Sequence, residues 1–239
     1  MMLYKKPTVI LASLAGLLLV SCSSSPTSSD ANVGQVKLTV RSSTTGAANA
    51  ANPQLTKATG LATITSARVV IEKIRFKSSI DDTLDFRFRQ PFIKDLALDT
   101  TANVIETVDV PFGSYKETEI EIDDLDPEDG QVYLDNPDLQ GRSIVVKGYV
   151  NNDPNQNFVF TSEFSEEQER EFSPPLVLDE NSPSTNVVLF IDMTGWFVDS
   201  SGNLLDPRVS ENHSAIEDNI KASIDVFEDR DDDGKRDDD

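Results

Sequence analysis

Residues 67–76 read Ala-Arg-Val-Val-Ile-Glu-Lys-Ile-Arg-Phe, and this stretch decides the fold class. It is rich in β-branched and apolar residues at both ends, which is typical of a β-strand. Toward the N-terminus, residues 36–40 alternate apolar and polar side chains, the period-two pattern of a half-buried strand. Toward the C-terminus, residues 84–88 alternate in the same way. The sequence therefore predicts strands on both sides of this stretch.

Similar patterns recur along most of the chain, which indicates a single mainly-β domain. The predicted strands cover residues 35–41, 67–76, 84–88, 92–98, 104–110, 115–122, 143–150, 158–164, 176–178 and 187–193. Turns rich in Pro, Gly, Asn and Asp separate them, and no helical crossover lies between them, so we expect an antiparallel β-sandwich over residues 35–211. Residues 43–60 predict a long first loop. The Asn/Asp/Pro-rich segment 151–157 predicts a hairpin between the strands on either side of it.

Composition excludes several classes of function. The chain has 239 residues, with 42 Asp and Glu against 21 Lys and Arg, and its formal net charge is −21. Such a charge repels phosphate backbones, so we expect no nucleic-acid partner. A single Cys and a single His exclude an internal disulfide, cysteine-based zinc sites and two-histidine metal centres.

The first 22 residues predict export and lipidation. Lys5 and Lys6 precede an apolar run over residues 9–20 that is too short to span a bilayer and suits a signal peptide over residues 1–21. The run ends Leu19-Val20-Ser21-Cys22, which resembles the lipobox of bacterial lipoproteins. The resemblance implies that Cys22 is acylated and then becomes the first residue. The alternative is a simple secretory signal in which this cysteine is incidental.

A tether to the membrane is expected to follow. Residues 22–34 are rich in Ser and Thr and have little to bury, so they predict a flexible segment that holds the folded domain at the cell envelope. No polybasic stretch accompanies the predicted anchor, so attachment should come from the acyl chains on Cys22. Ser23 after the cysteine resembles lipoproteins exported to the outer membrane.

The central sequence also resembles a family. A short apolar strand, a long loop, the stretch at 67–76 and then Pro111-Phe112-Gly113-Ser114-Tyr115 occur in this order. The order is similar to that of bacterial surface lipoproteins of unknown function with a prealbumin- or immunoglobulin-like β-sandwich. The resemblance implies a fold and a location over residues 35 to about 195, and no activity.

A helix is predicted near the C-terminus, within the segment 212–239. Ser214 and Glu217 have the spacing of a capping box, in which each side chain accepts the backbone N–H of the other residue. Ile216, Ile220, Ile224 and Phe227 then follow at spacings of four, four and three. This period predicts a helix that ends near Glu228 and packs one apolar face on the sandwich.

The residues after this helix predict a calcium loop. Asp229, Asp231, Asp233 and Asp237 occupy positions 1, 3, 5 and 9 of a D-x-D-x-D-G motif, and the carbonyl of Lys235 stands at position 7. Alternate carboxylates can surround a hard cation, and glycine at position 6 permits the sharp turn. The loop resembles half an EF-hand or a dockerin-type repeat without its twelfth ligand, which acidic residues near the C-terminus or in the segment 123–129 would have to replace. The alternative is an acidic, solvated tail, and we interpret residues 123–130 themselves as an acidic turn.

The function itself remains open between two classes. No GxSxG, GxGxxG or GxxxxGK motif is present, so we expect no enzyme. One hypothesis is a structural or adhesive surface module stabilised by Ca²⁺, with a protein or glycan partner at the cell surface. The other is a lipoprotein that binds a glycan or small ligand. Exposed aromatic residues such as Trp196, Phe197, Tyr133 or Tyr149 would favour the second, although we expect Trp196 in the core.

Overall fold

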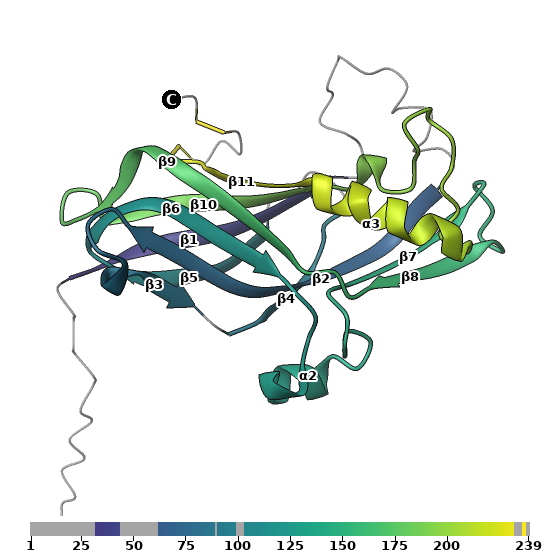
Figure 1. The fold of residues 1–239 in the computed structure, drawn as a ribbon, viewed down its shortest axis with the longest axis horizontal. Coiled ribbons are helices and arrows are strands. Elements are labelled where there is room, and N and C mark those ends of the chain that lie inside the picture. Colours follow the sequence, from purple (N-terminus) through teal and green to yellow (C-terminus); the bar gives the residue numbers. More distant parts are fainter. Residues whose placement is uncertain (1–31, 44–61, 89, 99–102, 232–235, 238–239) are drawn as a thin grey trace, which may run out of the picture. The chain divides into compact units, whose positions relative to one another are not determined.

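The structure is a computed structural model that describes residues 32–43, 62–88, 90–98, 103–231 and 236–237. Its strands form two sheets (Figure 1). The four-stranded sheet has the order β11-β10-β1-β5, with β1 at Val33–Ser43, β5 at Asn103–Pro111, β10 at Ser184–Asp192 and β11 at Ile224–Glu228. The seven-stranded sheet has the order β8-β7-β2-β6-β9, with β3 and β4 also paired to β2. Its strands are β2 (Ala62–Ser78), β3 (Phe86–Phe88), β4 (Phe92–Asp95), β6 (Gly113–Ile122), β7 (Ile144–Val150), β8 (Asn157–Ser162) and β9 (Glu166–Leu178).

This arrangement confirms the predicted β-sandwich with one helix near the C-terminus. Most neighbouring strands are antiparallel, and the predicted β7–β8 hairpin is present. Its turn passes through Asn151 and Asn152, which both adopt positive φ, as the asparagine-rich segment suggested. The β1–β10 pair is parallel, which strand patterns alone do not reveal. The segment 44–60 of the predicted first loop lies outside the described residues.

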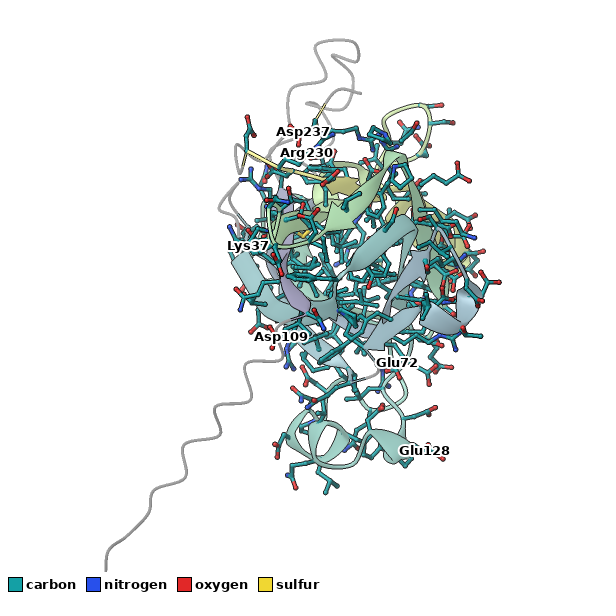
Figure 2. The ribbon with its side chains drawn as sticks, turned by 90° about the vertical axis from the view of Figure 1, so that its left-hand side faces the viewer. Lys37, Glu72, Asp109, Glu128, Arg230 and Asp237 are labelled. Atoms are coloured by element: carbon teal, nitrogen blue, oxygen red, sulfur yellow. The ribbon has the colours of Figure 1, made fainter. Side chains whose placement is uncertain are left out.

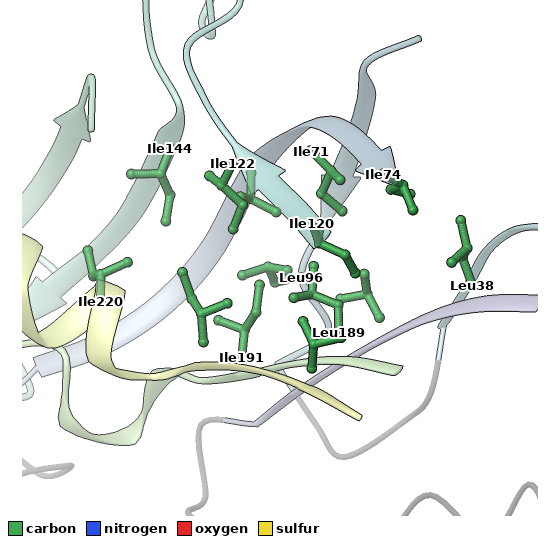
Figure 3. Packing of buried hydrophobic residues seen from close by; sticks show 14 of the residues in the cluster. Leu38, Ile71, Ile74, Leu96, Ile120, Ile122, Ile144, Leu189, Ile191 and Ile220 are labelled. Carbon is green, nitrogen blue, oxygen red and sulfur yellow. The ribbon is translucent and has the colours of Figure 1, made fainter. Parts of the chain in front are cut away.

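The core lies between the inner faces of the two sheets. Ile71, Ile74 and Phe76 of β2 are almost completely buried, as are Leu38 of β1 and Leu189 of β10. Figure 3 shows the isoleucine and leucine side chains of both sheets meeting in this layer. Trp196 and Phe197 belong to the same cluster, so the predicted core position of Trp196 is confirmed. The indole N–H of Trp196 donates to Ser223 Oγ at 2.8 Å, which satisfies its polar group inside the core.

The predicted C-terminal helix is wrong in its second half. Helix α3 covers His213–Ala222, and Ile216 and Ile220 pack into the core as predicted. Residues 224–228 instead form β11, antiparallel to β10. The spacing of their apolar side chains fits a helix as well as a strand. As a strand they pair with the edge of β10, whose backbone N–H and C=O groups a longer helix would have left unpaired.

The predicted capping box is also absent. The N-cap of α3 is Asn212, without a side-chain cap hydrogen bond. Glu217 Oε1 accepts a hydrogen bond from Ser162 Oγ at 2.5 Å, so this carboxylate joins the helix to β8 rather than closing its first turn. A tertiary contact has displaced the local one.

Several strand boundaries differ from the predicted ranges, and the differences at β9 and β1 have a simple reason. Strand β9 begins at Glu166, ten residues before the predicted strand 176–178. The prediction missed its first half because that half is highly charged and lacks the alternation of apolar and polar residues. Strand β1 begins at Val33, two residues inside the segment predicted as the tether. Backbone pairing with a neighbouring strand can extend a strand into residues that lack an apolar pattern.

The outer face of the seven-stranded sheet is partly covered by the segment 123–142, which we call the excursion. It contains the short helix α2 (Gln131–Asp135) and connects β6 to β7 (Figure 1). Leu125 and Leu139 of the excursion pack on Val70 and Val145 of the sheet and form a second, small apolar cluster. Arg68 of β2 holds the excursion down, because its guanidinium contacts Asp138 at 2.5 Å and Asn136 at 2.6 Å. Among the described residues, no helix has the length and apolar character needed to cross a membrane.

Candidate functional site

A break in the pairing of β2 places Glu72 on the outer face of the seven-stranded sheet. Ile71 pairs with Ile122 of β6, and Lys73 pairs with Glu121, so Glu72 is an extra residue between two successive pairs. This is the pattern of a β-bulge, which redirects a side chain and is common beside functional sites. Glu72 and Lys73 are both partly buried, whereas Ile71 and Ile74 on either side point into the core.

An open pocket of about 500 Å³ lies beside this bulge. Its lining residues are Glu72, Lys73, Arg75, Arg87 and Glu121. Both signs of charge therefore face one cavity, which suits a polar ligand better than an apolar one. In Figure 2, Glu72 lies on the sheet, at the side that faces the excursion, and Glu128 lies on the excursion.

The carboxyl group of Glu72 is electrostatically unusual. Burial raises the pKa of Glu72 to about 7, and the negative charges of Asp129, Asp123, Glu121 and Asp126 add to the effect. Its Oε2 atom is buried and accepts no hydrogen bond from any residue that the structure describes. A carboxyl group with a pKa near 7 can gain or lose a proton near neutral pH, so charge in this pocket depends on pH.

Next to the pocket, three rows of charged side chains cross the outer face of β2, β6 and β9. We call them the charge ladder. Each row has one cation of β2 and then one glutamate from each of the next two strands: Lys73–Glu121–Glu167, Arg75–Glu119–Glu169 and Lys77–Glu117–Glu171. Glutamates stand directly opposite each other between β6 and β9, which is unfavourable unless cations compensate them.

The cations of β2 provide this compensation. Arg75 contacts Asp85 at 2.5 Å and Glu119 at 3.2 Å, and Lys77 contacts Glu117, Glu119 and, at 3.1 Å, Glu169. Burial raises the pKa of Glu119, but the hydrogen bond and charge of Lys77 and the charge of Arg75 outweigh it and hold the pKa below its ordinary value. Glu119 is therefore ionised although it is almost fully buried.

One group of carboxylates in the described residues is close enough together to hold a metal ion. The ligand atoms of Glu117, Glu119 and Glu169 lie within 4.8 Å of one another. The ammonium group of Lys77 contacts all three, so it supplies the positive charge that an ion would otherwise bring. The trio is therefore part of the ladder, and it has no residue in common with the predicted calcium loop.

The structure places only part of that predicted loop. Asp229 is completely buried and lies against Asn186, whose carbonyl accepts the Asp229 N–H at 3.0 Å. Asp231 is exposed, and Asp233 and Lys235 lie outside the described residues. Asp237 lies beside Arg230 (Figure 2) and accepts its backbone N–H at 2.6 Å. The two ends of the loop thus meet, but Asp229, Asp231 and Asp237 do not form a common ligand group in the described residues.

The remaining predicted sites have different outcomes. Cys22, the predicted lipidation site, lies outside the described residues. Residues 123–130, interpreted as an acidic turn, form the start of the excursion and a short 3₁₀ helix at Pro127–Asp129. Sequence reasoning missed Glu72. A signal was present, because the buried Ile71 and Ile74 are three residues apart, which breaks the period of two expected for a strand.

No protein-family model, curated protein or solved structure matches this chain.

Proposed function

We propose that this chain is a lipid-anchored protein of the cell envelope, in the outer membrane, whose β-sandwich acts as a structural or adhesive surface module. The lipobox at Leu19–Cys22 supports the anchor, and the strongly acidic composition supports a cationic partner over a nucleic acid. The proposal assigns no catalytic reaction to the chain.

The observation that favours the structural role over glycan binding is that none of the four candidate aromatic side chains is exposed. Sugar-binding surfaces generally expose aromatic rings on which a sugar can stack. Here Trp196 and Phe197 are 0% and 3% exposed, and Tyr133 and Tyr149 are half-buried, with Tyr133 packed against the second apolar cluster. The outer face of the seven-stranded sheet offers a partner charged groups instead.

The anchor is tested by Cys22→Ala with labelled palmitate. We expect the variant to lose the label and to be unprocessed or released, because no other segment of the sequence is apolar enough to retain it. Cys22→Ser serves as a second variant that lacks the thiol but keeps its size. Unchanged labelling of either variant would contradict the lipoprotein proposal.

We also propose that the C-terminal loop binds Ca²⁺ weakly and stiffens this end of the domain. The loop leaves the sandwich directly from β11, and the Asp237 N–H donates to the Glu228 carbonyl at 3.3 Å, so its two ends are already joined. Ion binding would therefore cost little conformational entropy, because the ends of the loop are already close together. Asp237 would exchange its contact with Arg230 for the ion.

A second candidate function is the binding of a small polar ligand in the pocket beside Glu72. The mixed lining of the pocket favours a ligand with a cationic group for Glu72 and Glu121 and an acceptor group for Arg87. Because Glu72 is ionised above its pKa of about 7, such a ligand should bind more tightly at pH 8 than at pH 6.

Calorimetric titration with free arginine at both pH values tests this candidate. The expected result is a weaker affinity at pH 6, and Glu72→Gln should remove the difference between the two pH values. Glu128→Gln is the matched control, because Glu128 is an exposed acid of the excursion that does not line the pocket. No heat of binding at either pH would exclude this ligand class.

A further inference from the structure

One end of the sandwich exposes apolar side chains close to the start of the folded chain. Among the described residues, eight large hydrophobic side chains are exposed, and four of them lie at this end: Val33, Ile80, Leu84 and Val177. Ile80 is the most exposed of all, at 77%, and Leu84 is 58% exposed. We call these four residues the apolar tip.

Backbone contacts place Val33, Val177 and the neighbour of Ile80 at one turn, the β5–β6 turn at residues 111–114, and Leu84 belongs to the same β2–β3 connection as Ile80. Val33 pairs with Pro111, and Val177 pairs with Ser114. The Ser114 carbonyl accepts the N–H of Ser79 at 2.8 Å, which places the neighbouring Ile80 at the same turn. In Figure 1 the start of β1, the segment between β2 and β3 and the connection from β9 to β10 gather at the left-hand end.

The segment around Ile80 and Leu84 is held in a defined conformation. Asp85 accepts the N–H of Ser78 at 2.9 Å, and Asp81 caps the short 3₁₀ helix at Asp82–Leu84 by accepting the N–H of Thr83 at 2.8 Å. The exposed side chains are therefore presented by a structured turn. Exposed apolar side chains gathered at one place commonly mark an interaction surface.

The length of the chain between the anchor and this end indicates what covers the tip. Nine residues lie between Cys22 and Asn32, ten Cα–Cα steps in all, and the Asn32 carbonyl accepts the N–H of Phe112 at the β5–β6 turn. Such a segment reaches at most about 36 Å when fully extended, and about 16–19 Å on average if it is flexible. An acyl chain on Cys22 therefore keeps the apolar tip within a short distance of the bilayer.

We propose that the apolar tip docks on the membrane that holds the anchor, with Ile80 and Leu84 entering the headgroup region. This inference rests on the lipid anchor proposed above. The contact is weak by itself, but the tether makes it intramolecular and so raises its occupancy. Asp81 and Asp82 lie beside the two apolar residues and repel anionic headgroups, so the tip suits a zwitterionic lipid surface.

Spin labelling of the mature, lipidated protein tests the proposal. Cys22 is the only cysteine, and acylation blocks its thiol, so Ile80→Cys introduces the only thiol free to carry a nitroxide label. Leu134→Cys is the matched control, because Leu134 is 64% exposed on helix α2, in the excursion between β6 and β7. In phosphatidylcholine vesicles we expect the label at position 80 to be several-fold less accessible to a water-soluble nickel chelate than the label at position 134.

The possible outcomes separate the two proposals. Mass spectrometry first establishes whether Cys22 carries acyl chains, and a protein without them would overturn the anchor and the docking together. An acylated protein in which both labels are equally accessible would overturn the docking alone. Protection of position 80 in cell membranes but not in phosphatidylcholine vesicles would also overturn it and would indicate a protein partner. Leu84→Cys provides an independent second position with the same expectation.

Discussion

Glu72 is the residue whose position most affects the chemistry of this protein. A bulge in β2 turns its side chain toward the excursion, where burial and four neighbouring carboxylates disfavour its charge. An ionised glutamate in this place destabilises the fold, because the unfolded chain would solvate the same charge freely. Glu72 therefore lowers the stability of the fold. Buried groups with strongly shifted pKa values are common at functional sites.

This cost predicts a pH-dependent effect of Glu72→Gln. Between pH 4.5 and 7 the folded protein binds more protons at Glu72 than the unfolded chain does, so this group lowers stability as the pH rises through that range. Glu72→Gln should therefore stabilise the protein by about 1–2 kcal/mol at pH 8, after allowance for solvent screening, and by much less at pH 4.5. Urea unfolding followed by the fluorescence of Trp196 measures both values. An equal effect at the two pH values would show that the pKa of Glu72 is not raised.

At the scale of single elements, strands β6 and β9 depend on the cations of β2. Lys77 is the clearest case, because it contacts three glutamates whose ligand atoms lie within 4.8 Å of one another. Burial lowers the pKa of Lys77, but its hydrogen bonds to Glu117, Glu119 and Glu169 outweigh this effect and raise the pKa above its ordinary value. The ammonium group is therefore charged at neutral pH.

Lys77→Ala should thus be strongly destabilising. We expect a loss of about 2–3 kcal/mol at pH 7, because the variant leaves the nearly buried Glu119 with two close carboxylate neighbours and, among the described residues, Arg75 as its one cationic partner. The matched control is Lys116→Ala on β6, whose ammonium group is half exposed and 3.7 Å from Asp82, and which should cost less than about 0.5 kcal/mol. Urea unfolding compares the two, and similar losses would mean that the ladder has no special role.

At the scale of the whole molecule, the C-terminal segment completes the sandwich. Strand β11 extends the four-stranded sheet beside β10, and α3 buries Ile216 and Ile220 in the core. The predicted calcium loop is therefore attached to the sheet and does not hang from a separate tail. Any stiffening of this loop should influence the stability of the entire domain.

We predict that millimolar Ca²⁺ raises the Tm of the protein by a few degrees. The nearby Arg230, Lys235 and Arg236 reduce the local negative potential and favour a Kd on the order of 10⁻⁴–10⁻³ M. A concentration a few-fold above this Kd adds about 1 kcal/mol to stability, which corresponds to roughly 2–4 °C for a domain of this size. Asp231→Ala combined with Asp233→Ala should abolish the rise in a calorimetric scan. An equal rise in wild type and variant would mean that Ca²⁺ only screens the acidic surface.

The sequence by itself determined the fold class and most strands, because alternation of apolar and polar side chains follows directly from a strand with one buried face. It also determined the β7–β8 hairpin and the core position of Trp196, since turn chemistry and hydrophobicity are local properties. Three features required the tertiary structure. Residues 224–228 fit both a helix and a strand, and the open edge of β10 selected the strand. The charged half of β9 forms a strand only because β6 pairs with it. The raised pKa of Glu72 arises first from burial and then from carboxylates about 50 residues further along the chain, and only folding buries the group and brings those charges to it.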